Sequence, residues 1–202
     1  PPIAPIQIII IPIYKNNNEK IVKENANCLK RNLLQLGYRV FVDERNEYTA
    51  GWKYNEWEIK GVPIRINIGQ RDIENNTIEI VRRDTKQKYT ISVSSLIQLN
   101  ENIKSIFKEI QENLFKNAKK FATEKTKTIL NYDEFKETMS NSEGFILTGW
   151  CGNEECETSI KEETSADIRV IPFEQEALEK EVKNCIFCNR IAEKVAIFAK
   201  AY

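Results

Sequence analysis

Four of the five cysteines fall into two closely spaced pairs, Cys151 with Cys156 and Cys185 with Cys188. When a fold brings two such pairs together, four thiolates about 2.3 Å from the metal make a tetrahedral zinc site. Gly152 would let the backbone turn beneath the first thiolate. Four thiolates leave no coordination position for a reacting water, so we expect a structural zinc ion.

Other interpretations of the cysteines stay open. They could form two disulfides or have a redox use, although disulfides are rare in the cytosol. They could also be four unrelated buried residues, or the ligands of a zinc-dependent enzyme. All-cysteine ligation and the lack of histidine argue against that last alternative. Cys28 lies on the apolar side of an expected helix, so we predict that it is a core cysteine.

A second group of residues has the chemistry to bind a nucleic-acid base. Tyr54 and Glu58 are four residues apart, on one face of an expected helix. Arg65 follows on a strand, on the face opposite Ile64 and Ile66. This gives a ring that can stack, an acceptor and a donor, which a short turn could bring together. The alternative is a plain salt bridge between Glu58 and Arg65.

The neighbouring aromatic and basic residues carry less information. Trp57 is expected to be a core residue, whereas Trp52 could be either core or ligand. The remaining cations are solvated charges unless they line the same face, in which case they would contact phosphate without reading sequence. They are Lys53, Lys60, Arg82, Arg83 and Lys88.

Composition excludes several classes of function. The 202 residues include 30 Lys plus Arg and 30 Asp plus Glu, so an RNA site has to be a local patch. Without histidine there can be no Ser-His or Cys-His nucleophile and no His-ligated metal. The longest apolar run, residues 6–13, is too short to span a membrane. We therefore expect a cytoplasmic protein with no membrane partner.

The pattern of apolar residues predicts the elements that position these groups. Ile6–Ile11 is predicted to be a buried central strand. A helical stripe follows, ended by Gly37 as a left-handed cap, and Tyr38–Val42 is the next strand. The stripe consists of Val22, Ala26, Leu29, Leu33 and Leu36.

The rest of the chain continues the alternation of strands and helices, which indicates an α/β layer fold. We expect a helix over 49–60, strands over 62–68, 78–82 and 87–91, and a long helix from about 94 to 127. Short strands over 144–147, 168–171 and 194–199, with acidic connections, form a separate cysteine-bearing part. The boundary is expected near residues 125–130.

The stretch from Ala50 to Asp72, AGWKYNEWEIKGVPIRINIGQRD, resembles the anticodon-binding domain of prolyl-tRNA synthetases of the archaeal and eukaryotic type. The resemblance extends back through Pro2–Pro12 and forward through Val81–Asp84. The zinc-type cysteines and the ending Phe198–Tyr202 resemble the C-terminal domain of the same class II enzymes. The resemblance therefore covers essentially the whole chain.

The resemblance implies a mixed-sheet α/β anticodon-binding domain over 1–125, with a long C-terminal helix, and a small α+β zinc-binding domain over 126–202. It implies that Tyr54 stacks on an anticodon base and that Glu58 and Arg65 read guanine. Tyr54 departs from the commoner Phe, but stacking should survive. Arg71 and Lys53 are implied as further basic contacts to the anticodon.

Tyr202 is implied to reach toward a catalytic domain. The resemblance further implies a part in proline–tRNA ligation, with tRNA(Pro) rather than DNA as partner and a homodimeric parent enzyme. No segment here has the length of the catalytic domain that would use ATP and Mg²⁺, so we expect this chain alone to be non-catalytic. The alternative is a stand-alone, non-catalytic RNA-binding factor with a synthetase-derived fold.

Overall fold

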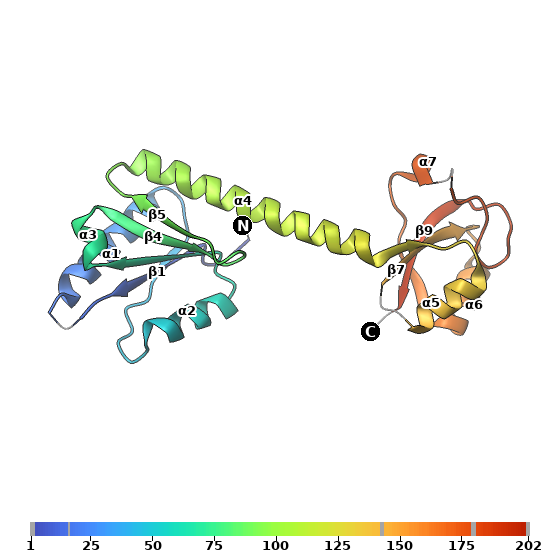
Figure 1. The fold of residues 1–202 in the computed structure, drawn as a ribbon. Coiled ribbons are helices and arrows are strands. Elements are labelled where there is room, and N and C mark those ends of the chain that lie inside the picture. Colours follow the sequence, from blue (N-terminus) through green and yellow to red (C-terminus); the bar gives the residue numbers. More distant parts are fainter. Residues whose placement is uncertain (1–2, 16, 142–143, 179–180, 201–202) are drawn as a thin grey trace. The chain divides into compact units, whose positions relative to one another are not determined.

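The computed structural model describes residues 3–15, 17–141, 144–178 and 181–200. The chain forms two compact units, Pro1–Lys116 and Asn117–Tyr202 (Figure 1). No described helix combines the length and the apolar character needed to cross a membrane. Tyr202 lies outside the described residues.

The first unit is built on a five-stranded sheet in the order β2-β1-β3-β4-β5. Strand β1 (Ile8–Ile13) pairs in parallel with β2 (Val40–Val42) and β3 (Ile64–Gly69). Strands β4 (Thr77–Arg82) and β5 (Lys88–Ser92) extend the sheet, with β4 antiparallel to β3 and β5 antiparallel to β4. The mixed sheet predicted from the sequence is therefore confirmed.

Strand β1 is covered on both faces, as its unbroken apolar sequence predicted. Ile8 and Ile10 pack in the main core beneath α1 (Glu19–Gln35) and α4 (Leu96–Lys125). Ile9 and Ile11 face the other way, into a smaller core with Trp57 of α2 (Ala50–Ile59). Figure 1 shows α2 on the opposite side of the sheet from α1 and α4.

Helix α1 buries four residues of its predicted stripe, whereas the fifth, Leu36, is its C-cap and is only partly buried. Gly37, just after the cap, takes the left-handed backbone conformation, with φ +88°. The prediction for Cys28 is wrong, because its side chain is exposed. One residue rotates a helix by about 100°, so the residue before buried Leu29 can point away from the core. A short helix that we did not predict, α3 (Gln70–Glu74), follows β3.

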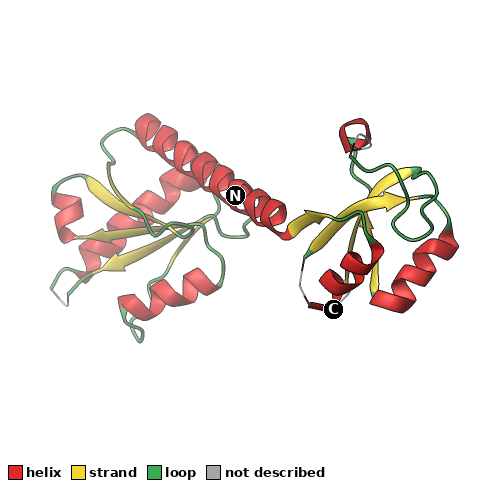
Figure 2. Cartoon of the chain, turned by 45° about the vertical axis from the view of Figure 1, so that its right-hand side comes forward, coloured by secondary structure: helices red, strands yellow, loops and turns green. Residues whose placement is uncertain are grey.

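The second unit holds a four-stranded sheet in the order β6-β7-β9-β8. Figure 2 shows its strands in yellow and its helices in red. The strands are β6 (Thr126–Thr128), β7 (Phe145–Trp150), β9 (Lys194–Lys200) and β8 (Ala166–Val170). Its helices are α5 (Tyr132–Asn141), α6 (Glu154–Thr164) and the single turn α7 (Gln175–Leu178). Phe135 of α5 packs edge-to-face on Phe198 of β9, and both are fully buried.

Helix α4 links the two units as one continuous element of 30 residues. Its buried residues are Leu99, Ile103, Ile106 and Ile110. The division between the compact units falls inside the helix, whereas the expected boundary at 125–126 coincides with its end at Lys125. The extent of the two domains remains a prediction.

Candidate functional site: a thiolate cluster and a surface patch

The four paired cysteines come from two separate turns of the second unit. Cys151 directly follows β7, and Cys156 lies in the first turns of α6. Between them Gly152 has φ +79°, which confirms the turn expected there. Cys185 and Cys188 lie in the turn that precedes β9. A hydrogen bond from the Ile186 N–H to the Gly149 carbonyl ties this turn to β7.

The four sulfur atoms lie within 4.8 Å of one another. The Sγ of Cys151 is 3.6 Å from that of Cys156 and 3.6 Å from that of Cys188. A tetrahedron with metal–sulfur bonds of about 2.3 Å has sulfur–sulfur edges of about 3.8 Å, whereas a disulfide bond is about 2.05 Å long. All five cysteines are free thiols, and these four are positioned to bind a metal ion.

The thiols of the cluster differ in pKa. Burial, together with hydrogen bonds to neighbouring thiols, raises the pKa of Cys156 to about 12. Hydrogen bonding with Arg190, whose Nε lies 3.3 Å from the Cys188 sulfur, lowers the pKa of Cys188 to about 6. Cysteine ligates a metal ion as the thiolate, so a bound cation would displace the remaining thiol protons.

In the first unit, Tyr54, Glu58 and Arg65 come together as their spacing predicted, and we call them the α2–β3 patch. Tyr54 and Glu58 are on α2, and Arg65 is near the start of β3. The Arg65 guanidinium lies 3.7 Å from the Tyr54 ring centroid, and its Nη1 is 3.6 Å from Glu58 Oε1. Stacker, acceptor and donor thus share one surface.

The α2–β3 patch is closed in this structure. Glu58 also pairs with Lys86, a partner that sequence reasoning missed because it lies on a distant turn. Burial lowers the pKa of Arg65, and its Nε is buried without a hydrogen-bond partner. The hollow between α2 and the strands has a free volume of about 10 Å³. That is about the space of one water molecule, so a base has to displace the ion pair to enter.

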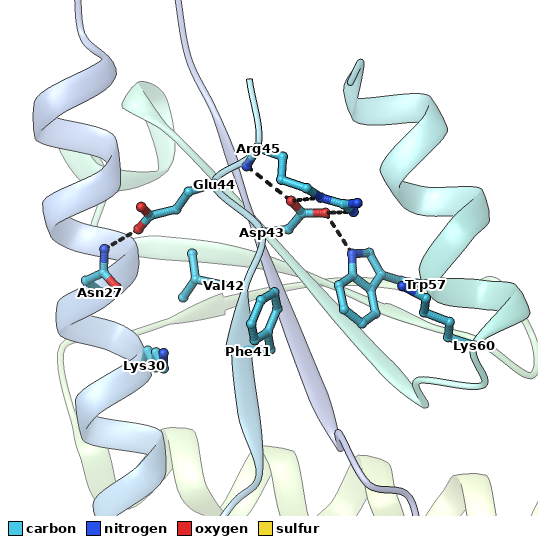
Figure 3. A pocket seen from close by; sticks show the side chains of 9 residues that line it. All are labelled: Asn27, Lys30, Phe41, Val42, Asp43, Glu44, Arg45, Trp57 and Lys60. Atoms are coloured by element: carbon cyan, nitrogen blue, oxygen red, sulfur yellow. Dashed lines mark hydrogen bonds and ion pairs between the residues drawn. The ribbon is translucent and has the colours of Figure 1, made fainter. Parts of the chain in front are cut away.

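Helix α2 is held by a buried carboxylate at the end of β2. Asp43 is 1% exposed and accepts hydrogen bonds from Trp57 Nε1 at 2.8 Å and from Arg45 Nε at 2.9 Å (Figure 3). Burial alone would raise the pKa of Asp43, but these hydrogen bonds lower it to about 2. The core position predicted for Trp57 is confirmed, since it is 7% exposed.

Two of the expected solvated charges are in fact buried, which corrects the prediction. Lys53 is 4% exposed, and its Nζ donates to the Asp43 backbone carbonyl at 3.2 Å. Arg82 is 5% exposed and is held by Asp84 and Glu109. Lys53 lies near Asp43, ten residues before it, and Arg82 pairs with Asp84, two residues after it, and with the distant Glu109. Neither presents a free ammonium or guanidinium group to solvent.

Arg71 is not brought to the α2–β3 patch. It lies on α3, which begins after Gly69, at the opposite end of β3 from Arg65. The four residues from Arg65 to the strand end correspond to roughly 13 Å. Arg71 is exposed. Arg83 is also exposed and lines the same hollow as the patch, which is the arrangement in which we expected such a cation to contact phosphate.

Two known families match parts of the chain. Residues 7–103 match the family described as "Anticodon binding domain". Residues 132–202 match the family described as "Prolyl-tRNA synthetase, C-terminal". These matches and the fold therefore define a protein of the anticodon-binding class.

Similar proteins narrow this class. The chain is 42% identical over 202 residues to proline–tRNA ligase 2 of Clostridioides difficile and 43% identical to the proline–tRNA ligase of Alkaliphilus oremlandii. It spans 40% of the length of each relative.

The crystal structure of prolyl-tRNA synthetase from Cryptosporidium parvum, complexed with L-proline and AMP, matches the whole chain with a TM-score of 0.84 and 34% identity. The chain covers 42% of that structure. The chain belongs to the prolyl-tRNA synthetase family and corresponds to its C-terminal region.

Proposed function

We propose that this chain binds tRNA(Pro) and recognises the two guanines of the proline anticodon with Tyr54, Glu58 and Arg65. The observation that supports it most directly is the α2–β3 patch, in which the Arg65 guanidinium contacts both the Tyr54 ring and the Glu58 carboxylate. RNA-binding proteins read loops by stacking unpaired bases on rings and bonding to their edges.

Guanine suits this set of groups. Its Watson–Crick edge has two donors, N1–H and N2–H, and one acceptor, O6. A carboxylate such as Glu58 can accept from both donors, while the guanidinium of Arg65 can donate to O6. Arg83 and Arg71 are exposed and free to approach phosphate, with Arg71 farther from the patch.

We propose zinc as the metal of the thiolate cluster. A set of four sulfur ligands at tetrahedral separations suits Zn²⁺, and with four protein ligands the ion would be structural. One zinc ion per chain, measured by elemental analysis of protein purified without added metal, is the expected result. Iron in its place, with the visible absorption of an iron–thiolate centre, would contradict the assignment.

The parent protein is proposed to be a proline–tRNA ligase, as its relatives are named. In that enzyme ATP and Mg²⁺ would act in a domain that this chain does not include. Proline would be joined to tRNA there, while the residues described here select the tRNA. We place this enzyme in the cytoplasm and expect it to be a homodimer, with Tyr202 directed toward the catalytic domain.

Anticodon recognition is tested with RNA hairpins that carry the proline anticodon or the same loop with both guanines replaced by adenine. Fluorescence anisotropy with the 202-residue chain should give tighter binding to the guanine loop. Each good base-edge contact typically contributes about 1–3 kcal/mol of discrimination. Equal dissociation constants for the two hairpins would refute the proposal.

A further inference from the structure

A pair of aromatic rings is exposed at the start of α2, away from the α2–β3 patch. Tyr48 and Trp52 stack with their ring centroids 3.8 Å apart and their planes within 11° of parallel. They are 38% and 44% exposed. Tryptophan is among the side chains that proteins bury most on average, so an exposed stacked pair suggests a ligand.

Arg45 holds this pair in place. Its guanidinium carbon lies 4.9 Å from the Tyr48 ring centroid and 5.4 Å from that of Trp52. The negative faces of two parallel rings repel each other, and a nearby cation offsets that repulsion. Arg45 is itself anchored by Asp43, at 2.7 Å, and by Glu56. The two rings are thus ordered before any ligand arrives.

The backbone at the start of α2 is also fixed. Thr49 is the N-cap residue, and its hydroxyl accepts from the Trp52 N–H at 3.3 Å. Trp52 precedes Glu58 by six residues, which corresponds to roughly 9 Å along the helix axis. Trp52 and Tyr54 are two residues apart and so point to opposite sides of α2. An RNA loop seated on the α2–β3 patch can reach the rings by passing the first turn of the helix.

The surroundings favour a nucleobase over an apolar protein surface as the occupant. The exposed neighbours of the rings in the loop are the amide of Asn46 and the carboxylates of Glu44 and Glu47, so a neutral base, and not a phosphate, is the part of an RNA that suits the rings. Docking of a protein commonly requires a continuous apolar patch. A nucleobase requires only a flat ring on which to stack, and its backbone can remain solvated.

We propose that Tyr48 and Trp52 form a second stacking platform, which receives an unpaired base of the anticodon loop outside the guanines read by the α2–β3 patch. This inference rests on the proposed function, because it assumes that an RNA loop is already bound beside it. The platform adds affinity without adding discrimination, since every base has a face that can stack.

The test combines Trp52→Ala with the two hairpins described above. Loss of one stacked base should weaken binding roughly 5- to 150-fold. The factor should be the same for the guanine loop and for the adenine-substituted loop. Trp52→Phe, which keeps a ring, should restore most of the affinity. Phe115→Ala is the matched control, because Phe115 is an exposed aromatic residue on α4.

An abasic scan locates the stacked base. Each loop base outside the guanines is removed in turn, and binding is measured with wild-type protein and with Trp52→Ala. At one position, removal of the base should weaken binding to the wild-type protein but leave binding to Trp52→Ala unchanged. Additive losses at every position, or full affinity of a folded Trp52→Ala variant, would overturn the platform. The anticodon proposal would still stand if wild-type protein prefers guanine, so the two failures are distinguishable.

Discussion

At the scale of single residues, Arg65 is the proposed donor to guanine O6. Arg65→Ala should weaken binding to the guanine hairpin by about 1–3 kcal/mol, and it should do so far less for the adenine hairpin. The physical reason is the lost donor to O6. Anisotropy titrations with both hairpins measure the effect.

Lys86→Met is the matched control for Arg65. Lys86 also pairs with Glu58, but it is 59% exposed and lies on a turn rather than on β3. The control should change affinity little and should not change the preference for guanine. A larger loss of preference in Lys86→Met than in Arg65→Ala would show that Arg65 does not read the base.

Asp43 should make the first unit sensitive to acid. Its pKa in the folded protein is about 2, below its ordinary value of 3.8, so its ionised form stabilises the fold. This contribution is complete above about pH 4 and is lost as the pH falls toward 2. Denaturant unfolding of wild type and Asp43→Asn should show a stability difference that shrinks by about 2 kcal/mol over that range. A difference independent of pH would contradict this role.

Single residues also show what the sequence could not provide. The association of Tyr54, Glu58 and Arg65 could be predicted, since helical and strand spacing determine which side chains share a face. Lys53 could not be placed correctly, because its partner is the loop carbonyl of Asp43, which only the tertiary fold brings near. Lys86 was missed for the same reason.

At the scale of elements, the thiolate cluster depends on the turn between β7 and α6. Gly152→Ala should cost about 1–2 kcal/mol, because its φ of +79° is unfavourable for a residue with a Cβ. The new methyl group would also meet the carboxylate of Glu193. We expect weaker metal retention, measured by competition with a chromogenic chelator.

Gly37→Ala is the comparison for Gly152→Ala. Gly37 has a φ of +88°, and nothing lies within 4 Å of where its Cβ would be. This change should destabilise the first unit by a similar amount and leave metal retention unaltered. Equal metal retention in the two variants would mean that the turn at Gly152 does not position the ligands.

The elements themselves could be predicted where apolar residues recur at a regular period. Helix α1 has four buried positions on one stripe, and β1 is almost wholly apolar. Helix α6 was overlooked because its buried face is sparse, consisting of Cys156, Ile160 and Thr164. Strand β6 has the sequence Thr-Lys-Thr and is defined by backbone pairing with β7, which side-chain patterns cannot indicate.

For the whole molecule, the two units should respond separately to loss of metal. Incubation with a strong chelator should unfold residues from about 130 onward, because four unliganded thiols in a small core no longer hold the two turns together. The first unit has its own extensive core and should remain folded. Hydrogen exchange with mass spectrometry would resolve the two responses. Simultaneous loss of protection in both units would contradict the expected domain boundary.

The closed ion pair between Glu58 and Arg65 has a consequence for how a wrong base is rejected. The protein supplies its own occupant for the site, so each incoming base competes with that internal contact. Guanine can compensate both charged groups at once, whereas adenine lacks an acceptor at the position of O6 and would leave the guanidinium unmatched. Selectivity would therefore come mainly from the binding free energy that a wrong base loses by leaving a charged group unpaired, and less from the binding free energy that guanine gains. Modest affinity combined with strong selectivity is the expected behaviour of such a self-occupied receptor.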